Sequence, residues 1–254
     1  RFNGVYARWL HILYVSRSDE GYSESPNPYF QSYSNFLTKN YNDDSAEAIL
    51  YTWLDLYKGI FWANQVIDNS VNIDMDEDLK KRIQGEAYFL RGLHFFNIAA
   101  VYGRGPLTLT AFAGEGTPEI AEQPRLYEQA RKDFDEAIQR LPPSYSELKN
   151  LGRATEGAAR GMRIKVLMQE RNWAEAEIEC RALFAMKNSG GQPLYSLVSN
   201  YKDNFSQAGD NNSESVFEVQ FAPGLQSGVE VGCNRAKFMG IAADGLSWAD
   251  AYPR

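Results

Sequence analysis

The sequence predicts a mostly α-helical protein, built on a scaffold of tetratricopeptide-like helix pairs with irregular loops and one short strand. Apolar residues recur at helical spacing in successive segments between residues 42 and 187. Short links join these segments, so we expect them to be antiparallel neighbours. Trp173 and Ala176 have the spacing of a degenerate tetratricopeptide repeat, and small residues stand against large ones nearby.

Two helices are predicted at the start of the chain. The first covers residues 3–14, and an aromatic-rich segment with turn sequences follows it. The second begins at the Asp-Asp-Ser capping sequence of residues 43–45 and carries apolar residues up to Ile67. Three tryptophans at helical packing positions are assigned to the core: Trp53, Trp62 and Trp173.

The central helix is predicted from about Asp76 to Gly103. Leu90, Ile98 and their apolar neighbours form a wide stripe, which is typical of a helix packed between others. The helix is expected to end at Gly103, because glycine tolerates a positive φ and the proline that follows cannot continue the hydrogen-bond ladder. Residues 107–110 are predicted to leave as an extended piece.

Three further helices complete the predicted scaffold. One begins at Pro124, the next is capped by Thr155, and the last begins after a turn at Asn172. Gly157 and Gly161 are expected to allow a neighbouring helix to approach closely. After residue 187 the composition changes to loop, apart from a short strand predicted by the alternation in residues 216–221.

Composition and charge exclude several classes of function. The net charge of -7 and the lack of a basic run argue against nucleic-acid binding. There is no apolar stretch near the length of a membrane span, and since the chain opens at Arg1 we expect a processed or partial product. Cys180 and Cys233 could pair in an oxidising compartment, but the helical pattern favours Cys180 as a free buried thiol.

The sequence contains no pattern typical of an enzyme, a metal site or a cofactor site. His94 lies between apolar residues of the central helix, where a packed histidine is favoured over a catalytic one. The acidic residues 74–78 are interpreted as a solvated helix start. Glycosidase carboxylates cannot be found by spacing in a helical chain, so hydrolysis stays a low-ranking alternative.

A ligand-binding surface is the function that the residues support. Aromatic rings stack on the C–H faces of sugars, while amides, carboxylates and guanidinium groups bond the hydroxyl groups. Residues 17–36 and 221–248 combine both types, although such aromatics could equally anchor long loops to the body. The residues predicted to contact ligand are Arg17, Asp19, Tyr22, Asn27, Tyr29, Phe30, Asn234 and Trp248.

The central helix also resembles a known family. Residues 86–96, Glu-Ala-x-Phe-Leu-Arg-x-Leu-x-Phe-Phe, and residues 101–107, Val-Tyr-Gly-x-x-Pro-Leu, are similar to the central helix of SusD/RagB-like outer-membrane nutrient-binding lipoproteins. Further landmarks resemble the family in the same order, at residues 53–68, 152–159 and 214–221. Ser18-Asp19-Glu20 matches an early landmark that lies near the ligand loops of the family.

The resemblance implies a function without catalysis. It implies one SusD-like domain over residues 1–254, with the scaffold at 42–187 and ligand-side segments at 1–41 and 188–254. The domain is expected to be incomplete, an N-terminal half, because family members are about twice as long. Such a protein binds oligosaccharide at the extracellular face of the outer membrane, through a lipid anchor absent from these residues, and passes it to a TonB-dependent transporter of the SusC type. The alternatives are peptide uptake of the RagB type and a protein–protein adaptor.

Overall fold

The computed structural model describes residues 5–16, 21–22, 47–111, 116–221, 225–226, 229–230 and 252–253. The chain divides into two compact units, one of residues 1–58 and 221–254 and the other of residues 59–220. Helix α4 (Glu47–Ser70) begins in the first unit and ends in the second. No helix among the described residues is long and apolar enough to cross a membrane.

The first unit contains the predicted N-terminal helix and short strands that were not predicted. The helix consists of a π-helical turn, Val5–Trp9, followed by α2 (Leu10–Ser16). The strands form two antiparallel pairs: β1 (Gly21–Tyr22) with β6 (Tyr252–Pro253), and β4 (Leu225–Gln226) with β5 (Val229–Glu230).

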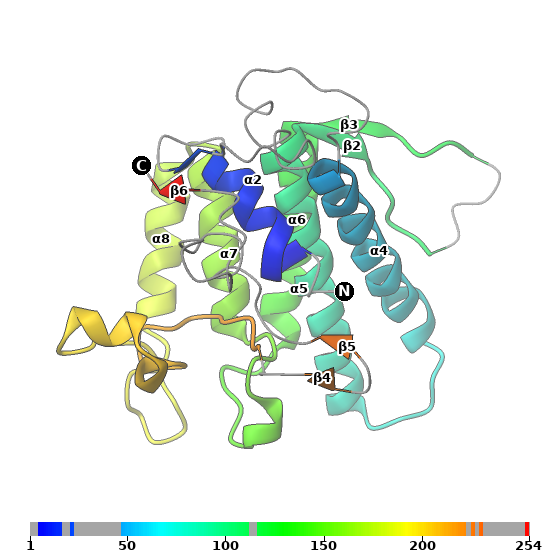
Figure 1. Cartoon of the computed structure of the whole chain (residues 1–254). Helices are drawn as coiled ribbons and strands as arrows, with labels where there is room; N and C mark the ends of the chain where they lie inside the picture. The colour runs from blue at the N-terminus through cyan, green and yellow to red at the C-terminus, as the bar shows by residue number, and fades with distance from the viewer. Residues whose placement is uncertain are drawn as a thin grey trace. The chain divides into compact units, whose positions relative to one another are not determined.

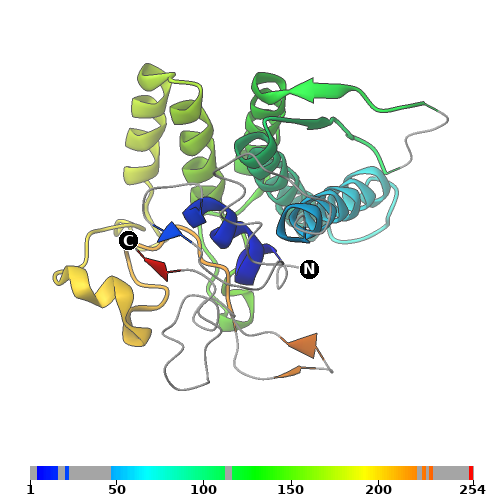
Figure 2. The ribbon, with the colours of Figure 1, turned by 45° about the horizontal axis from the view of Figure 1, so that its top comes forward.

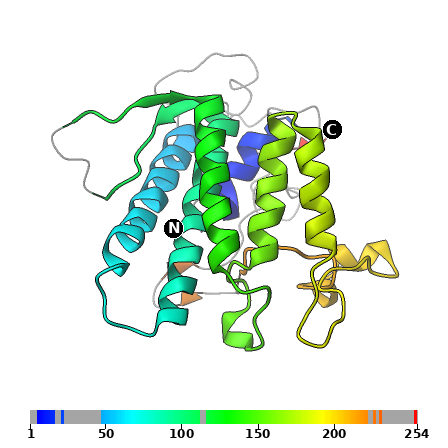
Figure 3. The same cartoon turned by 180° about the vertical axis from the view of Figure 1, so that it is seen from behind.

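The second unit is a succession of antiparallel helices, which confirms the predicted tetratricopeptide-like scaffold (Figures 1 and 3). After the C-terminal part of α4 come α5 (Glu77–Tyr102), α6 (Gln123–Arg140), α7 (Glu156–Gln169) and α8 (Trp173–Phe184). Short 3-10 helices lie in the α6–α7 connection, at Leu148–Asn150, and after α8, at Tyr201–Phe205 and Gln207–Gly209.

Helix α5 begins and ends where the sequence predicts, and the Gly103 end is closed as expected. Asp76 accepts a hydrogen bond from the Leu79 N–H at 2.8 Å and so satisfies a free donor of the first turn. At the other end Gly103 has a φ of 76°, and its N–H donates to the Ala99 carbonyl oxygen at 3.1 Å. This left-handed position closes the helix and favours glycine.

A short strand pair that was not predicted follows α5, directly before the residues predicted to leave as an extended piece. Strand β2 (Arg104–Pro106) pairs antiparallel with β3 (Ile120–Glu122), at the ends of α5 and α6 (Figure 2). Residues 107–110 form no strand, and only the Leu107 N–H extends the pairing, to the Glu119 carbonyl oxygen at 2.8 Å. The prediction missed β3 because its partner lies more than a dozen residues away.

The later helices also begin where local chemistry predicts. Helix α6 has a proline in its first turn, a position that needs no N–H donor. Thr155 caps α7, with its hydroxyl oxygen accepting from the Ala158 N–H at 3.1 Å. Asn172 caps α8, with its side-chain oxygen accepting from the Glu175 N–H at 3.4 Å.

The core of the second unit combines aromatic packing with one buried ion pair. Phe89 and Phe134 are fully buried and pack between α5 and α6, with ring centroids 6.0 Å apart. Beside them Arg91 bonds both carboxylate oxygens of Asp133, at 2.9 and 2.7 Å, and the two side chains are 7% and 1% exposed. Burial raises the pKa of the Asp133 carboxyl, whereas the hydrogen bonds from Arg91 and Gln129 oppose this rise.

The Arg91 guanidinium joins three parts of the second unit. It also donates to the Asn64 side-chain oxygen on α4 at 2.8 Å and to the Leu109 carbonyl oxygen at 3.1 Å. Asn64 in turn donates to the Thr108 carbonyl oxygen at 3.0 Å. The buried pair therefore holds α4, α5, α6 and the segment after β2 in one arrangement.

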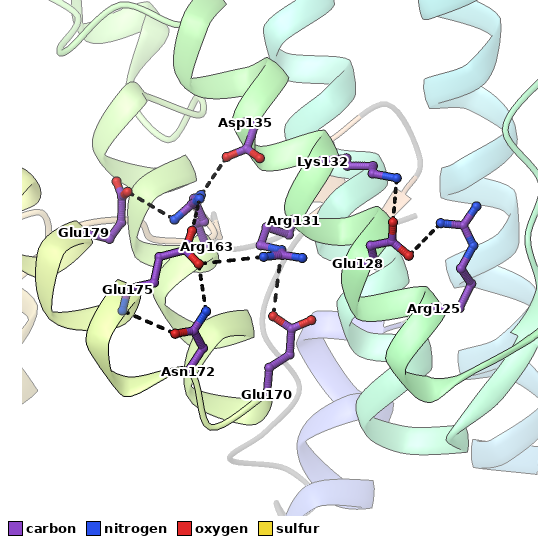
Figure 4. Close-up of polar contacts among 10 residues, drawn as sticks. All are labelled: Arg125, Glu128, Arg131, Lys132, Asp135, Arg163, Glu170, Asn172, Glu175 and Glu179. Atoms are coloured by element: carbon purple, nitrogen blue, oxygen red, sulfur yellow. Dashed lines mark hydrogen bonds and ion pairs between the residues drawn. The ribbon is translucent and has the colours of Figure 1, made fainter.

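A second set of ion pairs joins α6, α7 and α8 at the surface (Figure 4). Arg163 on α7 contacts Asp135 on α6 at 2.6 Å, and Glu175 and Glu179 on α8 at 2.6 and 3.3 Å. Burial lowers the pKa of the Arg163 guanidinium, but the hydrogen bonds to Asp135 and Glu175 outweigh it and leave the pKa raised. Arg131 adds longer contacts of 3.8 Å to Glu170 and Glu175.

Two predictions about the later segments were wrong. Residues 216–221 form no strand, because their backbone pairs with no other strand in the described part of the chain. Phe217 packs on Phe89 instead, with ring centroids 5.0 Å apart. Gly157 admits the Tyr195 side chain rather than a helix, since a Cβ atom there would lie 2.0 Å from the phenol oxygen. At Gly161 the neighbour is Val216, which is also not helical.

The assignment of three tryptophans to the core was wrong for two of them. Trp62 and Trp173 are 58% and 60% exposed, whereas Trp53 is half-buried and packs on Tyr57. Helical periodicity places a residue on a stripe, but both α4 and α8 carry apolar residues on more than one side. Periodicity alone therefore does not tell which stripe faces a neighbour.

The structure also describes one cysteine and the central histidine. Cys180 is a free thiol, as predicted, but it is only half-buried, and Cys233 lies outside the described residues. His94 is packed inside the unit, as predicted, and burial lowers its pKa to about 3. The imidazole is therefore neutral at physiological pH.

Candidate ligand-binding pocket

A cavity of about 330 Å³ opens between the α6–α7 connection and the segment of residues 194–218. Its volume lies at the lower end of the range typical of small-molecule sites. The wall combines three aromatic rings, Tyr145, Tyr195 and Phe217, with amides and hydroxyl groups. The uncharged polar residues of the wall other than tyrosine are Ser144, Ser146, Asn150, Thr155, Asn211, Asn212, Ser213 and Ser215.

The aromatic rings of the pocket are held by contacts on their outer sides. Tyr145 donates to the Ala154 carbonyl oxygen at 3.0 Å and lies 3.3 Å from a Glu86 carboxylate oxygen. Burial raises the pKa of the Tyr145 phenol, and the Glu86 charge raises it further. Tyr195 fits against Gly157, and Phe217 rests edge-on against the buried Phe89. The rings are thus preorganised before any ligand arrives.

Charged side chains in the wall are engaged with neighbours. Arg153 donates to Glu86 at 2.8 Å and to Asn150 at 3.1 Å. Glu218 accepts from the Asn211 N–H at 3.0 Å, and Glu147 pairs with a lysine at 3.0 Å. The pocket therefore presents little unpaired charge to a ligand.

Hydroxyl groups are the free polar groups of the pocket. The side-chain hydroxyl groups of Ser144, Ser146 and Ser215 make no hydrogen bond within the described part of the chain. Rigid aromatic faces with free hydroxyl groups suit a neutral ligand that has both apolar and hydrogen-bonding surfaces, such as a sugar. Among the described residues, no group of three or more His, Cys, Asp or Glu side chains could hold a metal ion.

The side chains of the eight residues predicted from the sequence to contact ligand lie outside the part of the chain that the structure describes. Seven lie outside the described residues altogether: Arg17, Asp19, Asn27, Tyr29, Phe30, Asn234 and Trp248. The eighth, Tyr22, has its backbone in β1, opposite Tyr252, but its side chain is outside the description.

The pocket itself was not predicted. One signal for it was present, because Pro-Pro-Ser-Tyr-Ser at residues 142–146 places an aromatic residue among turn formers, as in the N-terminal segment. Tyr195 and Phe217 carry no such signal, since they come from segments more than 45 residues further along the chain.

The family profile and the curated relatives that match this chain agree with one another. A family profile described as "Starch-binding associating with outer membrane" matches residues 11–167. A SusD-like protein of Formosa agariphila is 28% identical over 184 residues, which cover 71% of this chain and 34% of that protein. The chain thus spans about a third of the length of this curated relative.

Solved structures share the fold. A SusD superfamily protein of Bacteroides vulgatus superposes with a TM-score of 0.78 at 24% identity, covering 98% of this chain and 51% of that one. Surface glycan-binding protein A of Bacteroides thetaiotaomicron, in complex with laminarihexaose, gives a TM-score of 0.70 at 18% identity, covering 84% and 44%. Because the profile matches more than half of the residues, the chain belongs to the SusD-like family, whose profile describes starch-binding proteins associated with the outer membrane.

Proposed function

We propose that this protein binds oligosaccharide or polysaccharide at the cell surface, without catalysis, and passes it to a TonB-dependent transporter of the SusC type. The observation that carries the proposal is the family match over residues 11–167. The laminarihexaose complex of a protein with the same fold supports a glycan as the ligand. The proposed location is the extracellular face of the outer membrane, held by an N-terminal lipid anchor.

The pocket is chemically suited to this role. Sugar rings present C–H faces to aromatic side chains and hydroxyl groups to amides and serines, and the wall around Tyr145, Tyr195 and Asn212 offers both. Burial raises the pKa of the Tyr195 phenol, which therefore stays protonated as a hydrogen-bond donor. The eight residues predicted from the sequence remain proposed contacts in addition to the pocket.

Titration calorimetry tests the proposal. The protein is titrated with maltohexaose, laminarihexaose, levan and pectin oligosaccharides and with a mixed peptide pool, and the sugars are then checked for cleavage. We expect heat from at least one glycan and no cleaved product. Heat from the peptides alone favours peptide uptake, silence throughout favours the adaptor, and cleavage overturns the non-catalytic proposal.

A pair of variants tests the pocket as the binding site. Ser146 is exposed at the pocket wall, so Ser146→Trp is expected to obstruct the pocket without disturbing the core. Ser189 is also exposed but lies in the turn after α8 and does not line the pocket, which makes Ser189→Trp the matched control. Glycan affinity is expected to fall at least tenfold only in Ser146→Trp. Equal affinities of the two variants would show that the pocket is not the binding site.

A further inference from the structure

Two aromatic side chains project from α4 in the second unit. Trp62 is 58% exposed and Phe61 is 41% exposed. Their rings form an edge-to-face pair with centroids 5.4 Å apart and an interplanar angle of 66°. The pair therefore stabilises its own geometry while one side stays open to solvent.

Amide side chains continue the same side of the helix. Gln65 and Asn69 follow Trp62 by three and seven residues, the spacing that places side chains on one helical face. Asn69 donates to the Gln65 carbonyl oxygen at 2.8 Å and to its side-chain oxygen at 3.0 Å. This leaves the Gln65 amide nitrogen and the Asn69 side-chain oxygen as a donor and an acceptor without partners among the described residues.

This part of α4 carries little charge. Between Gly59 and Ser70 the only ionisable side chain is Asp68, and it accepts a hydrogen bond from the Ala111 N–H at 2.7 Å. An anionic ligand would find no cationic side chain between these residues, and the carboxylate that a cationic ligand could use is already engaged with the Ala111 N–H. A neutral ligand with an apolar face and a hydroxyl rim matches the rings and the amides.

Trp173 provides an internal comparison. It is exposed to a similar degree, 60%, yet within the described residues no aromatic ring packs on it. Ala176, Glu177 and Cys180 follow it on α8 by three, four and seven residues, and none of them carries an amide. Both tryptophans are exposed, so exposure does not distinguish Trp62 from Trp173. The paired aromatic ring and the free amide groups beside Trp62 do.

We propose that Phe61, Trp62, Gln65 and Asn69 form a second sugar-binding surface, on which one ring of a neutral glycan chain stacks on Trp62 while the amides bond its hydroxyl groups. The proposal rests on the proposed function for the class of ligand. A rigid helix holds all four side chains, so binding orders few additional groups. This surface is separate from the pocket, and none of its residues lines the pocket.

Calorimetry with maltohexaose and laminarihexaose tests the surface in the full chain. Trp62→Ala is expected to weaken binding about threefold to tenfold, the range of one aromatic stacking contact. Trp62→Tyr is expected to restore most of the affinity, and Trp173→Ala to leave it unchanged. Ring-current shifts or quenching of tryptophan fluorescence by the sugar should disappear in Trp62→Ala and persist in Trp173→Ala.

The outcomes separate the two proposals. If the wild type binds none of the glycans, the proposed function fails and this inference fails with it. If the wild type binds but Trp62→Ala binds equally well, only the second surface is overturned. A Trp62→Ala variant that keeps its glycan affinity but loses self-association in sedimentation experiments would identify a protein-docking face and also overturn it.

Discussion

Replacing Arg91 by methionine should strongly destabilise the second unit. The substitution removes two hydrogen bonds to Asp133, at 2.9 and 2.7 Å. It leaves a carboxylate that is 1% exposed, and Gln129, at 3.0 Å, is its one remaining side-chain partner among the described residues. Breaking a buried ion pair from one side costs about 3–5 kcal/mol. The contacts of Arg91 to Asn64 and to the Leu109 carbonyl oxygen are lost as well.

The surface pair of Arg125 and Glu128 provides the matched control. Its nitrogen–oxygen distance of 2.8 Å is similar, but the side chains are 40% and 37% exposed. Arg125→Met is therefore expected to cost far less stability than Arg91→Met. Equilibrium urea unfolding of both variants, followed by circular dichroism at constant pH, compares the two costs directly.

A double variant separates the burial of charge from the loss of packing. Arg91→Met with Asp133→Leu removes both charges, so it should recover more than half of the stability lost by Arg91→Met alone. If Arg91→Met costs no more than Arg125→Met, or if the double variant is less stable than the single one, the assigned role of the buried pair is wrong.

Two further predictions concern Gly59 and His94. A Cβ atom at Gly59 would lie 2.2 Å from the His94 Nε2 atom, which is too close for the two side chains to coexist without a shift. Gly59→Ala should therefore lower the free energy of unfolding by at least about 1 kcal/mol, even though alanine favours the helix by about 1 kcal/mol over glycine. Gly161→Ala, whose nearest contact is 3.3 Å, is the helical control in the same unfolding measurement, and equal stabilities would contradict the prediction. The pKa of His94 is about 3 in the folded protein and about 6.5 in the unfolded chain, so below pH 6.5 the unfolded chain binds a proton that the folded protein does not. The free energy of unfolding therefore falls as the pH drops below 6.5, by about 2–3 kcal/mol at pH 4.5. His94→Gln should remove this slope whereas His11→Gln keeps it, and parallel pH profiles for wild type and His94→Gln would refute the linkage.

The helix ends could be predicted because their causes are local. Asp76, Thr155 and Asn172 each bond an N–H three residues ahead, and Gly103 bonds a carbonyl four residues back. Such contacts are visible in a window of a few residues. The family resemblance depended on the motifs of residues 86–107 in combination with the landmarks at 53–68, 152–159 and 214–221, each of which is likewise a short local pattern.

The pocket could not be predicted because its wall is assembled from separate segments. Tyr145 and Tyr195 are fifty residues apart in the sequence, and they line one cavity only after α7 and α8 have folded between them. Neither residue belongs to a spacing pattern. The wrong strand at residues 216–221 has the same origin, since a strand requires a partner that the sequence does not specify.

The sequence by itself determined the helical class, the capped ends of the helices and the SusD-like family, because each depends on side chains that act within one or two turns. Only the tertiary structure decided which apolar stripes are buried. Phe89 and Trp62 both lie at helical spacing in apolar helices, yet the first is fully buried and the second is 58% exposed. The pairing of Arg91 with Asp133, across 42 residues, likewise exists only once α5 packs on α6. Burial depends on which helices become neighbours, and that choice is made by packing between distant segments.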